Sequence, residues 1–367
     1  MDRRTLLPSL LALPCLCLAA CSEDPTGTPS DDAPQTAASA PIDAARTGPT
    51  QVRWTIATND GPDTPTGEAI ARLTVLLHET SGGTMLLVPA WEAAGNPDDW
   101  DQAVARTVIR GDHQLGFVPA RAFDALDVSS LQALQTPFLL TSTKRVGVVV
   151  ESPVVDELME GLDDIGLTGL ALYPEDVRRL FSYGDPLTTP ALMSDAVVRA
   201  PYSRMTDAVL ARVGATTTDV QSHAWDAAVA SGELSGVESS FAGVLSTGTA
   251  ARLTTAANQP LFPKVNVLFV NREDFEGLEE DHRKALRRAA FQLQKEARDW
   301  PDESEDARAF CAAGGRVIEA TVDDVRALRG ALVAVDPPAD PDSTRRLADE
   351  IAELVVDLPR TDGVGTC

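Results

Sequence analysis

The sequence contains few of the residues on which several functional classes depend. Only 4 of its 367 residues are His, 4 are Lys and 5 are Cys, and aromatic residues make up 5%. Lys and Arg together number 31 against 55 Asp and Glu, so the formal net charge is −24. Binding to nucleic acids and to anionic membranes depends on many basic contacts to phosphates, so we expect neither partner. This charge does not exclude one buried arginine that holds a small anion.

The sequence also lacks the motifs of common enzyme classes. It contains no GxSxG, HExxH, GxGxxG or GxxxxGKS/T pattern. Ser222, His223 and Asp226 lie within five positions, whereas a hydrolase triad usually joins residues from separate elements. We therefore expect no catalytic residue, no cofactor and no metal site. A surface-anchored hydrolase is the third of three functional hypotheses for this chain.

No apolar run is long enough to span a bilayer, but the first residues have the pattern of an export signal. Arg3 and Arg4 precede an apolar run that ends in small residues before Cys21. The run is shorter than the roughly 20 residues of a transmembrane helix. The segment Leu18-Ala19-Ala20-Cys21 resembles the lipobox of bacterial lipoproteins, which implies cleavage before Cys21 and a lipid on its sulfur. The alternative is an ordinary secretory signal that is cut after a small residue.

Residues 21–50 predict a tether between this anchor and the folded part. They are rich in Pro, Ser, Thr, Asp and Ala and show no apolar periodicity, so they cannot bury enough surface to fold. Once the signal is removed and Cys21 is lipidated, Cys311 and Cys367 are the remaining cysteines. Export to an oxidising compartment favours a disulfide between them. Two unpaired thiols are the alternative.

From Gln51 onward, strand and helix patterns alternate. The spacing predicts strands at 52–58, 85–90 and 115–120 and helices at 67–80 and 100–109, followed by strands at 170–173, 195–201 and 265–271. This order is typical of an α/β fold with a largely parallel sheet. Apolar residues at steps of three and four then predict a helix from Arg272 to Trp300, long enough to cross between two lobes.

Arg199 is the clearest candidate for ligand binding. It closes a short apolar strand just before Pro201, and ligands of open α/β sheets bind outside the carboxyl ends of the strands. A guanidinium there can bind a carboxylate through two parallel hydrogen bonds. The alternative from position alone is a structural salt bridge with an acidic side chain.

Several short segments, in order and with similar spacing, resemble the DctP-type substrate-binding proteins of tripartite ATP-independent periplasmic (TRAP) transporters. The resemblance covers nearly all of residues 52–290. The segments are SGGTMLLVPAWEAAG, LQTPFLL, Pro186–Pro190, Arg199–Pro201, Val213–Ala215, Gly232–Gly236 with Glu238, and VNVLFVNREDFEGL.

The resemblance implies a fold and a set of domain boundaries. The expected fold is α/β and two-lobed, like a type II periplasmic binding protein, with a ligand cleft, crossing strands and a long helix that bridges the lobes. The boundaries are 1–20 for the signal, 21–50 for the lipidated cysteine and tether, 51–174 with 265–303 for lobe I, 175–264 with 304–358 for lobe II, and 359–367 for a C-terminal tail.

The resemblance also implies the residues of the cleft. Arg199 falls on the family's functional arginine, and Arg179 is expected as a second polar anchor. Ser239 occupies the place of a cleft asparagine, and Asn59 lies in the loop after the first strand. Ser222 and Trp225 belong to a segment in which this chain departs from the family pattern, which leaves the shape of the ligand open.

The function that the resemblance implies is solute capture outside the cytoplasm. We expect a lipoprotein on the outer face of the cytoplasmic membrane, held there by its lipid alone. It would close on a small carboxylate and deliver it to the integral-membrane subunits of a TRAP permease. The alternative is a ligand-sensing adaptor of the same fold that acts on a signalling partner.

Overall fold

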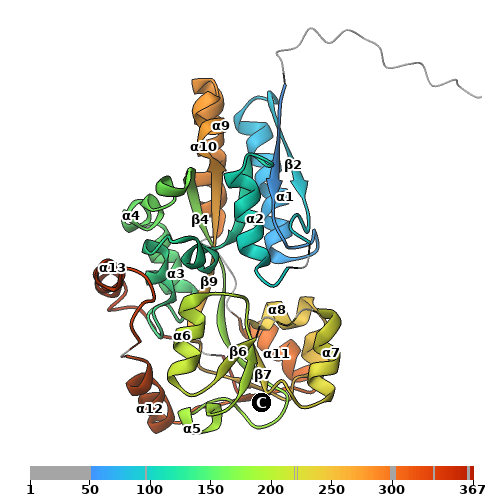
Figure 1. The fold of residues 1–367 in the computed structure, drawn as a ribbon, viewed down its shortest axis with the longest axis vertical. Coiled ribbons are helices and arrows are strands. Elements are labelled where there is room, and N and C mark those ends of the chain that lie inside the picture. Colours follow the sequence, from blue (N-terminus) through green and yellow to red (C-terminus); the bar gives the residue numbers. More distant parts are fainter. Residues whose placement is uncertain are drawn as a thin grey trace, which may run out of the picture. The chain divides into compact units, whose positions relative to one another are not determined.

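The protein has two α/β lobes, which occupy the upper and lower halves of Figure 1. The computed structural model describes residues 51–95, 97–218, 220, 222–297, 303–333, 335–361 and 364–367, without the side chains of Ser222 and His223. Cys21 and the tether lie outside the described residues, so the lipid anchor stays a prediction. The prediction of a two-lobed α/β fold is confirmed.

Lobe I contains five neighbouring strands in the order β2-β1-β3-β9-β4. Their bounds are Val52–Ala57 (β1), Met85–Ala90 (β2), Leu115–Pro119 (β3), Leu167–Ser182 (β4) and Phe262–Asn271 (β9). One face packs against α1 (Pro65–Thr80), α9 (Arg272–Gly277) and α10 (Glu280–Glu296). The other packs against α2 (Trp100–Ile109), α3 (Thr143–Val150), α4 (Val154–Glu160) and the 3-10 helices η1 (Ala120–Leu126) and η2 (Ser130–Gln135), with η3 (Asp163–Ile165) just before β4. The strands β1, β2 and β3 are parallel, as their alternation with helices predicts.

Lobe II continues the sheet in the order β6-β5-β7-β4, and β8 and β10 extend it beyond β4. The strands are β5 (Val197–Arg199), β6 (Thr216–Thr218), β7 (Gly236–Ser239), β8 (Thr255–Ala257) and β10 (Arg316–Ile318). The helices are α5 (Pro190–Met193), α6 (Arg204–Arg212), α7 (Ser222–Ala230), α8 (Phe241–Ser246), η4 (Thr249–Arg252), α11 (Ser304–Ala312) and α12 (Val322–Leu332). Two apolar clusters, one with α6 and α12 and one with α8 and α11, form the core of this lobe.

Two long strands join the lobes. The first part of β4 pairs with β9 in lobe I, while its end pairs with β7 and β8 in lobe II. The β4–β9 register shifts between Gly169 and Ala171 and again between Pro174 and Asp176. The second shift lies where the chain passes from one lobe to the other, so it sets which β4 side chains point toward the space between the lobes.

The expected bridging helix differs from the prediction. The chain is extended at Leu278 and Glu279, which separates α9 from α10. Helix α10 packs on lobe I, where Gln294 accepts a hydrogen bond from the N–H of Leu172 at 2.9 Å and donates one to the carbonyl of Val150 at 2.7 Å. Residues 298–302 lie outside the described part of the chain. Within that part, the crossing strands join the lobes and α10 covers lobe I alone.

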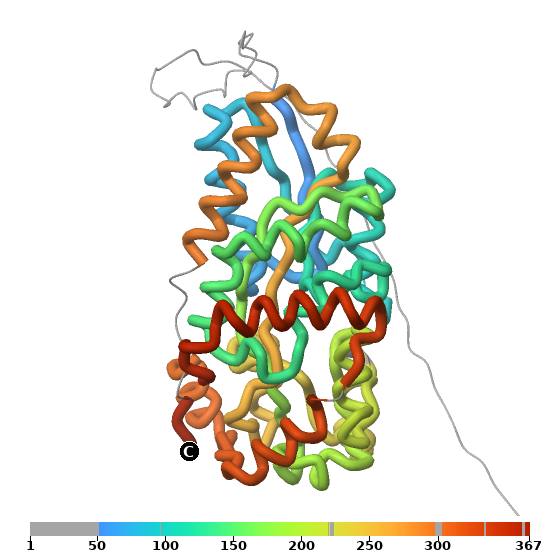
Figure 2. The backbone as a smooth tube through the Cα atoms, turned by 90° about the vertical axis from the view of Figure 1, so that its left-hand side faces the viewer, coloured from blue at the N-terminus to red at the C-terminus, as the bar shows by residue number. Residues whose placement is uncertain are grey.

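The C-terminal region also corrects the predicted domain boundaries. Helix α13 (Pro341–Leu354) buries Leu347 and Ile351 in the lobe I core beside η2, α3 and α4, although residues 304–358 were expected in lobe II. Figure 2 shows α13 lying across the middle of the fold, above α12. An amphipathic helix can pack on either lobe, and its pattern does not indicate which one.

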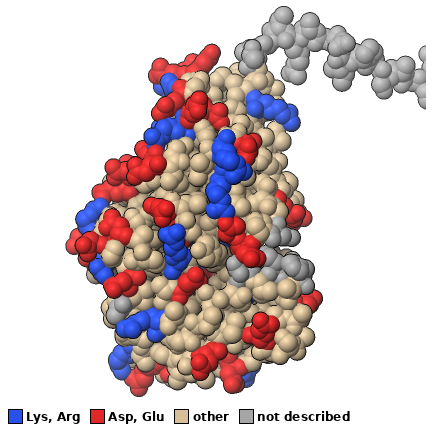
Figure 3. All heavy atoms as spheres, in the orientation of Figure 1, with Lys and Arg blue, Asp and Glu red and all other residues tan. Residues whose placement is uncertain are grey.

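Acidic side chains are spread over the surface. Figure 3 shows them scattered across both lobes on the face drawn, with basic side chains in small groups between them. Exposed pairs such as Arg346 with Glu157 at 2.8 Å contribute about 0–1 kcal/mol each. Within the described segments, no helix combines the length and the apolar composition that crossing a bilayer requires.

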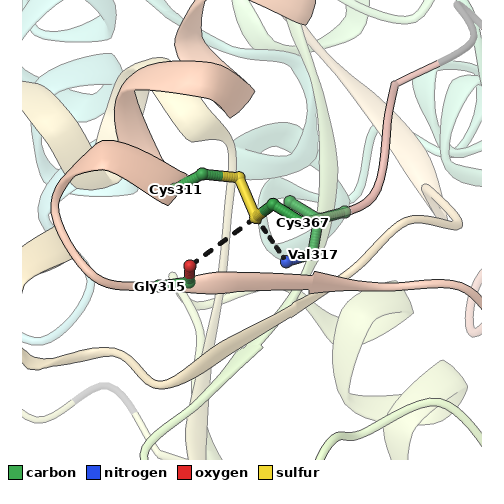
Figure 4. Close-up of a disulfide and its surroundings, with 4 residues drawn as sticks. All are labelled: Cys311, Gly315, Val317 and Cys367. Atoms are coloured by element: carbon green, nitrogen blue, oxygen red, sulfur yellow. Dashed lines mark hydrogen bonds between the residues drawn. A yellow bond between two sulfur atoms is a disulfide. The ribbon is translucent and has the colours of Figure 1, made fainter.

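A disulfide joins the C-terminus to lobe II. Cys367 is bonded to Cys311 of α11, which is the pairing that the sequence favours. Figure 4 shows the sulfur of Cys367 beside β10, where it accepts a hydrogen bond from the N–H of Val317 at 3.3 Å. Helix α13 lies between Cys311 and Cys367 in the sequence and packs on lobe I. The loop of chain that the disulfide closes therefore runs from lobe II to lobe I and back.

We expect this loop to contribute to stability by restricting the unfolded chain. A variant with Cys311→Ser and Cys367→Ser should lose about 2–4 kcal/mol of unfolding free energy, measured by urea denaturation. Reduction of the wild-type protein should cause a similar loss and should not affect the double variant. Equal urea midpoints for the wild type and the double variant would show that the bridge adds nothing.

Candidate functional site

A cavity of about 260 Å³ lies between the two lobes. Lobe I lines it with the loop after β1, the start of α2 and the end of β3. Lobe II lines it with the ends of β5 and β7 and with α7, α8 and η4, and the crossing strands supply Glu175, Arg178 and Lys264. We call this space the interlobe cavity. The carboxyl ends of parallel strands meet at this place in both lobes.

The lobe I wall depends on a tight contact beside α1. Thr64 caps α1 by accepting a hydrogen bond from the N–H of Gly67 at 3.1 Å. A Cβ atom at Gly67 would lie 2.4 Å from the carbonyl oxygen of Gly61, so only glycine lets this loop lie against the helix. The loop presents Asn59 and Asp60 to the cavity. The buried Oδ1 atom of Asn59 has no hydrogen-bond partner among the described residues.

The lobe II wall is built on two parallel strands. Strands β5 and β7 pair side by side and place Arg199, Glu238 and Ser239 at their carboxyl ends. Helix α8 approaches closely, since a Cβ atom at Gly243 would lie 2.8 Å from the Oγ atom of Ser239. The absence of a side chain at Gly243 therefore leaves room for the Ser239 hydroxyl at the cavity wall.

Four cationic and four acidic side chains line the cavity, and three of the cations are paired. The pairs are Arg121 with Asp101 at 3.1 Å, Arg178 with Glu238 at 2.7 Å, and Lys264 with Glu175 at 2.6 Å. Burial opposes the charge of Glu238, but the Arg178 guanidinium holds its pKa below the usual value. Burial likewise opposes the charge of Glu175, and Lys264 holds that pKa down with help from Thr66 and Asn266. These charges satisfy one another within the protein.

Arg199 is the fourth cation, and its guanidinium has no ion pair among the described residues. Two tryptophans lie against it: the guanidinium carbon is 5.0 Å from the ring centre of Trp100 in lobe I and 4.8 Å from that of Trp225 in lobe II. Its buried Nε atom lacks a hydrogen-bond partner in the same part of the chain. Burial, with a smaller effect of Arg178, lowers the pKa of Arg199 to about 10, so the group stays charged at neutral pH.

This arrangement can bind a carboxylate. The unpartnered Nε–H and the neighbouring Nη–H of a guanidinium match the two oxygens of a carboxylate, and each charge-assisted hydrogen bond contributes on the order of 1.5–3 kcal/mol. The flat rings of Trp100 and Trp225 exclude water beside the cation. Among the described residues, no group of three or more His, Cys, Asp or Glu side chains is arranged to hold a metal ion.

Four of the residues predicted for the site line the cavity: Asn59, Arg199, Trp225 and Ser239. Ser222 opens α7, but its side chain lies outside the described residues. The structure thus brings together residues from four separate segments of the sequence.

Arg179 corrects the prediction of a second polar anchor. It is fully buried away from the cavity, where it forms an ion pair with Glu303 and donates hydrogen bonds to the carbonyls of Ala257 at 3.2 Å and Asn258 at 2.9 Å. Its neighbour Arg178 lines the cavity instead. Adjacent strand residues point to opposite faces, and the register shift just before them decides which one points inward.

Several other lining residues were not predicted from the sequence. Trp100 begins a helix at the carboxyl end of β2, a position from which it could have been selected. Arg121, Lys264 and Glu175 carry no such signal, because their proximity depends on how β4 and β9 cross. Only the tertiary structure brings these charges together.

Comparison with known proteins agrees with this architecture. The family model of the bacterial extracellular solute-binding proteins of family 7, DctP, matches residues 56–335. The uncharacterized protein y4mM of Sinorhizobium fredii is 27% identical over 201 residues, which are 54% of this chain and 36% of that protein. This chain therefore spans about a third of the length of that relative.

Two solved structures illustrate the likeness of fold. A TRAP periplasmic solute-binding protein from Ralstonia eutropha, with bound (S)-2-acetolactate, has a TM-score of 0.73 and 16% identity over 83% of this chain and 98% of that one. One from Shewanella oneidensis, with bound succinate, has a TM-score of 0.72 and 14% identity over 83% and 99%. The match of the family model over most of the chain shows that the protein belongs to the bacterial extracellular solute-binding proteins of family 7, the DctP family.

Proposed function

We propose that this protein captures a small organic acid outside the cytoplasm and delivers it to a TRAP-type membrane permease. The observation that carries the proposal is the Arg199 guanidinium, which is the one cavity-lining cation without an ion pair in the described part of the chain. Arg199 is partly buried and its Nε atom is fully buried, and a desolvated charge without a partner is costly unless a ligand supplies the opposite charge.

Capture proceeds by closure of the two lobes. Trp100 and Asp101 come from lobe I, whereas Arg199 and Trp225 come from lobe II, so the complete site exists only when the lobes approach. Closure removes water from the guanidinium, which strengthens its attraction to a carboxylate. The ligand thereby shifts the protein toward the closed state. The β4 and β9 strands are the connection about which this motion occurs.

The charges of the cavity favour an acid with one carboxylate. A second carboxylate would meet cations that are already paired with Asp101, Glu238 or Glu175. Hydroxyl groups fit better, because they can donate to these carboxylates and accept from Ser239 or Asn59. The relative from Ralstonia eutropha binds such an acid, since acetolactate carries one carboxylate, one hydroxyl and one keto group.

The family and the first residues of the chain support the proposed delivery and location. Membership of a family of extracellular solute-binding proteins supports delivery to a membrane permease, and the lipobox-like segment Leu18–Cys21 supports a lipid anchor on Cys21. The protein would then hold its ligand close to the permease while contacting the membrane through its lipid.

The first test removes the free guanidinium. A thermal-shift screen should include 2-acetolactate, galactonate, lactate, succinate and malate. An acid at about 100 times its Kd adds about 2.7 kcal/mol, or roughly 4 °C or more in Tm. Arg199→Gln should weaken binding of the best acid at least 30-fold, about 2 kcal/mol. Without ligand the variant should unfold at the wild-type Tm or above it, because no native ion pair is lost.

Arg212→Gln is the matched control. Arg212 lies in the same lobe, exposed on α6, with its Nε–H bonded to the carbonyl of Ala331. This control changes the net charge equally and should bind the acid as the wild type does. Unchanged affinity in Arg199→Gln would refute the proposed role of this arginine.

A second test concerns the number of carboxylates. Isothermal titration should give the tightest monocarboxylate a Kd at least tenfold below those of succinate and malate, since one free cation is available. If a dicarboxylate binds more tightly than every monocarboxylate of the panel, the charge argument is wrong.

A third test concerns the anchor. The wild-type protein should sediment with membranes in its native host, and Cys21→Ser should release it into the soluble extracytoplasmic fraction. Cys17→Ser, four residues earlier, should leave the protein on the membrane. Soluble wild-type protein would instead support an ordinary secretory signal.

A further inference from the structure

A second cavity, of about 520 Å³, lies between α12 and α13. Lobe I lines it with the loop Thr136–Leu139, Arg145 and α13, whereas lobe II lines it with Met205 and the end of α12. None of its described lining residues belongs to the interlobe cavity. We call it the α12–α13 cavity. Its volume lies in the range of small-molecule sites.

Four arginines line this cavity, and three of them lack an ion pair among the described residues. Arg345 pairs with Asp336 and Asp342, but no pair is formed there by Arg145, Arg329 or Arg360. The acidic lining residue Asp349 makes no ion pair in that part of the chain either. In a chain with 55 acidic residues, three neighbouring arginines without an ion pair are unexpected.

Arg145 has a structural reason to lie there. Its side chain is 2% exposed and donates to the carbonyls of Leu139, Pro359 and Leu358 at 3.0, 2.9 and 2.8 Å. These bonds hold the C-terminal segment on lobe I. Carbonyl oxygens satisfy its donors without neutralising its charge, so Arg145 contributes a positive potential to the cavity.

No comparable set of hydrogen bonds explains the position of Arg329. It stands on α12 with its guanidinium carbon 5.1 Å from the ring centre of Phe138, and its buried Nε atom has no partner among the described residues. Burial lowers the pKa of Arg329, and the charge of Arg360 lowers it further. The native contacts therefore leave this cation with an unused donor and a repulsive neighbour.

The remaining wall of the cavity is largely apolar. The apolar lining residues include Phe138, Leu332, Val333, Val335, Ala352 and Val356. Val333 is 84% exposed and Val356 is 66% exposed, so both rim the cavity with unburied apolar surface. A ligand that covers them would gain about 25 cal/mol for each Å² of apolar area removed from water.

We propose that the α12–α13 cavity is a second ligand site, which binds a small organic anion with an apolar body, such as a medium-chain carboxylate. The anionic group lies against Arg329 and Arg360, and the hydrocarbon part covers the exposed side chains of Val333 and Val356. This inference does not depend on the function proposed for the interlobe cavity, since the two cavities share no described lining residue.

The test uses octanoate and the purified full-length protein in isothermal titration. Octanoate should bind the wild type and Arg199→Gln with equal affinity, which separates the two cavities. Arg329→Gln should weaken its binding at least tenfold. Arg326→Gln, on the same helix and exposed in a pair with Asp323, should leave the affinity unchanged. Sodium sulfate should bind at least tenfold more weakly than octanoate, because it cannot cover the apolar wall.

Val333→Asp tests the same cavity independently if Arg329→Gln folds poorly. Its side chain is exposed, so folding should be retained, and the added negative charge at the rim should weaken octanoate at least tenfold. The proposal is overturned if octanoate does not bind, if Arg199→Gln removes its binding, if both α12–α13 cavity variants retain full affinity, or if sulfate binds equally well.

Discussion

The architecture between the lobes depends on one positive charge that the protein leaves uncompensated. Arg121, Arg178 and Lys264 each contact an acidic partner, whereas Arg199 contacts two tryptophan rings and no carboxylate of the described chain. The other cations already have acidic partners in the protein, so a ligand does not have to neutralise them. The free guanidinium then becomes the position at which an anion gains most by replacing water. The paired charges set the polarity around it.

The proposed closure would act on two connections between the lobes. Strands β4 and β9 run through both lobes, and their register shifts between Pro174 and Asp176, where the lobes meet. The C-terminal segment forms a separate connection: α13 packs on lobe I and the disulfide at Cys367 returns the chain to lobe II. Any closure of the interlobe cavity must therefore be accommodated by both connections.

The sequence predicted the features that local patterns encode. The alternation of strands and helices indicated the α/β class. The end of an apolar strand drew attention to Arg199, and the resemblance to the family made it the predicted ligand-binding arginine. What it could not predict depends on tertiary contacts. The choice between Arg178 and Arg179 rests on a register shift that no local pattern reveals. The lobe on which α13 packs and the approach of Trp100 to Arg199 depend on how distant elements meet.

The most direct test of this account is a crystal structure of the protein with the acid that stabilises it most. The account predicts a ligand carboxylate within hydrogen-bond distance of the Nε and Nη atoms of Arg199, beside the rings of Trp100 and Trp225, with the Arg178–Glu238 pair intact. A ligand held in the interlobe cavity with its carboxylate on another cation, and Arg199 still without an anionic partner, would contradict it.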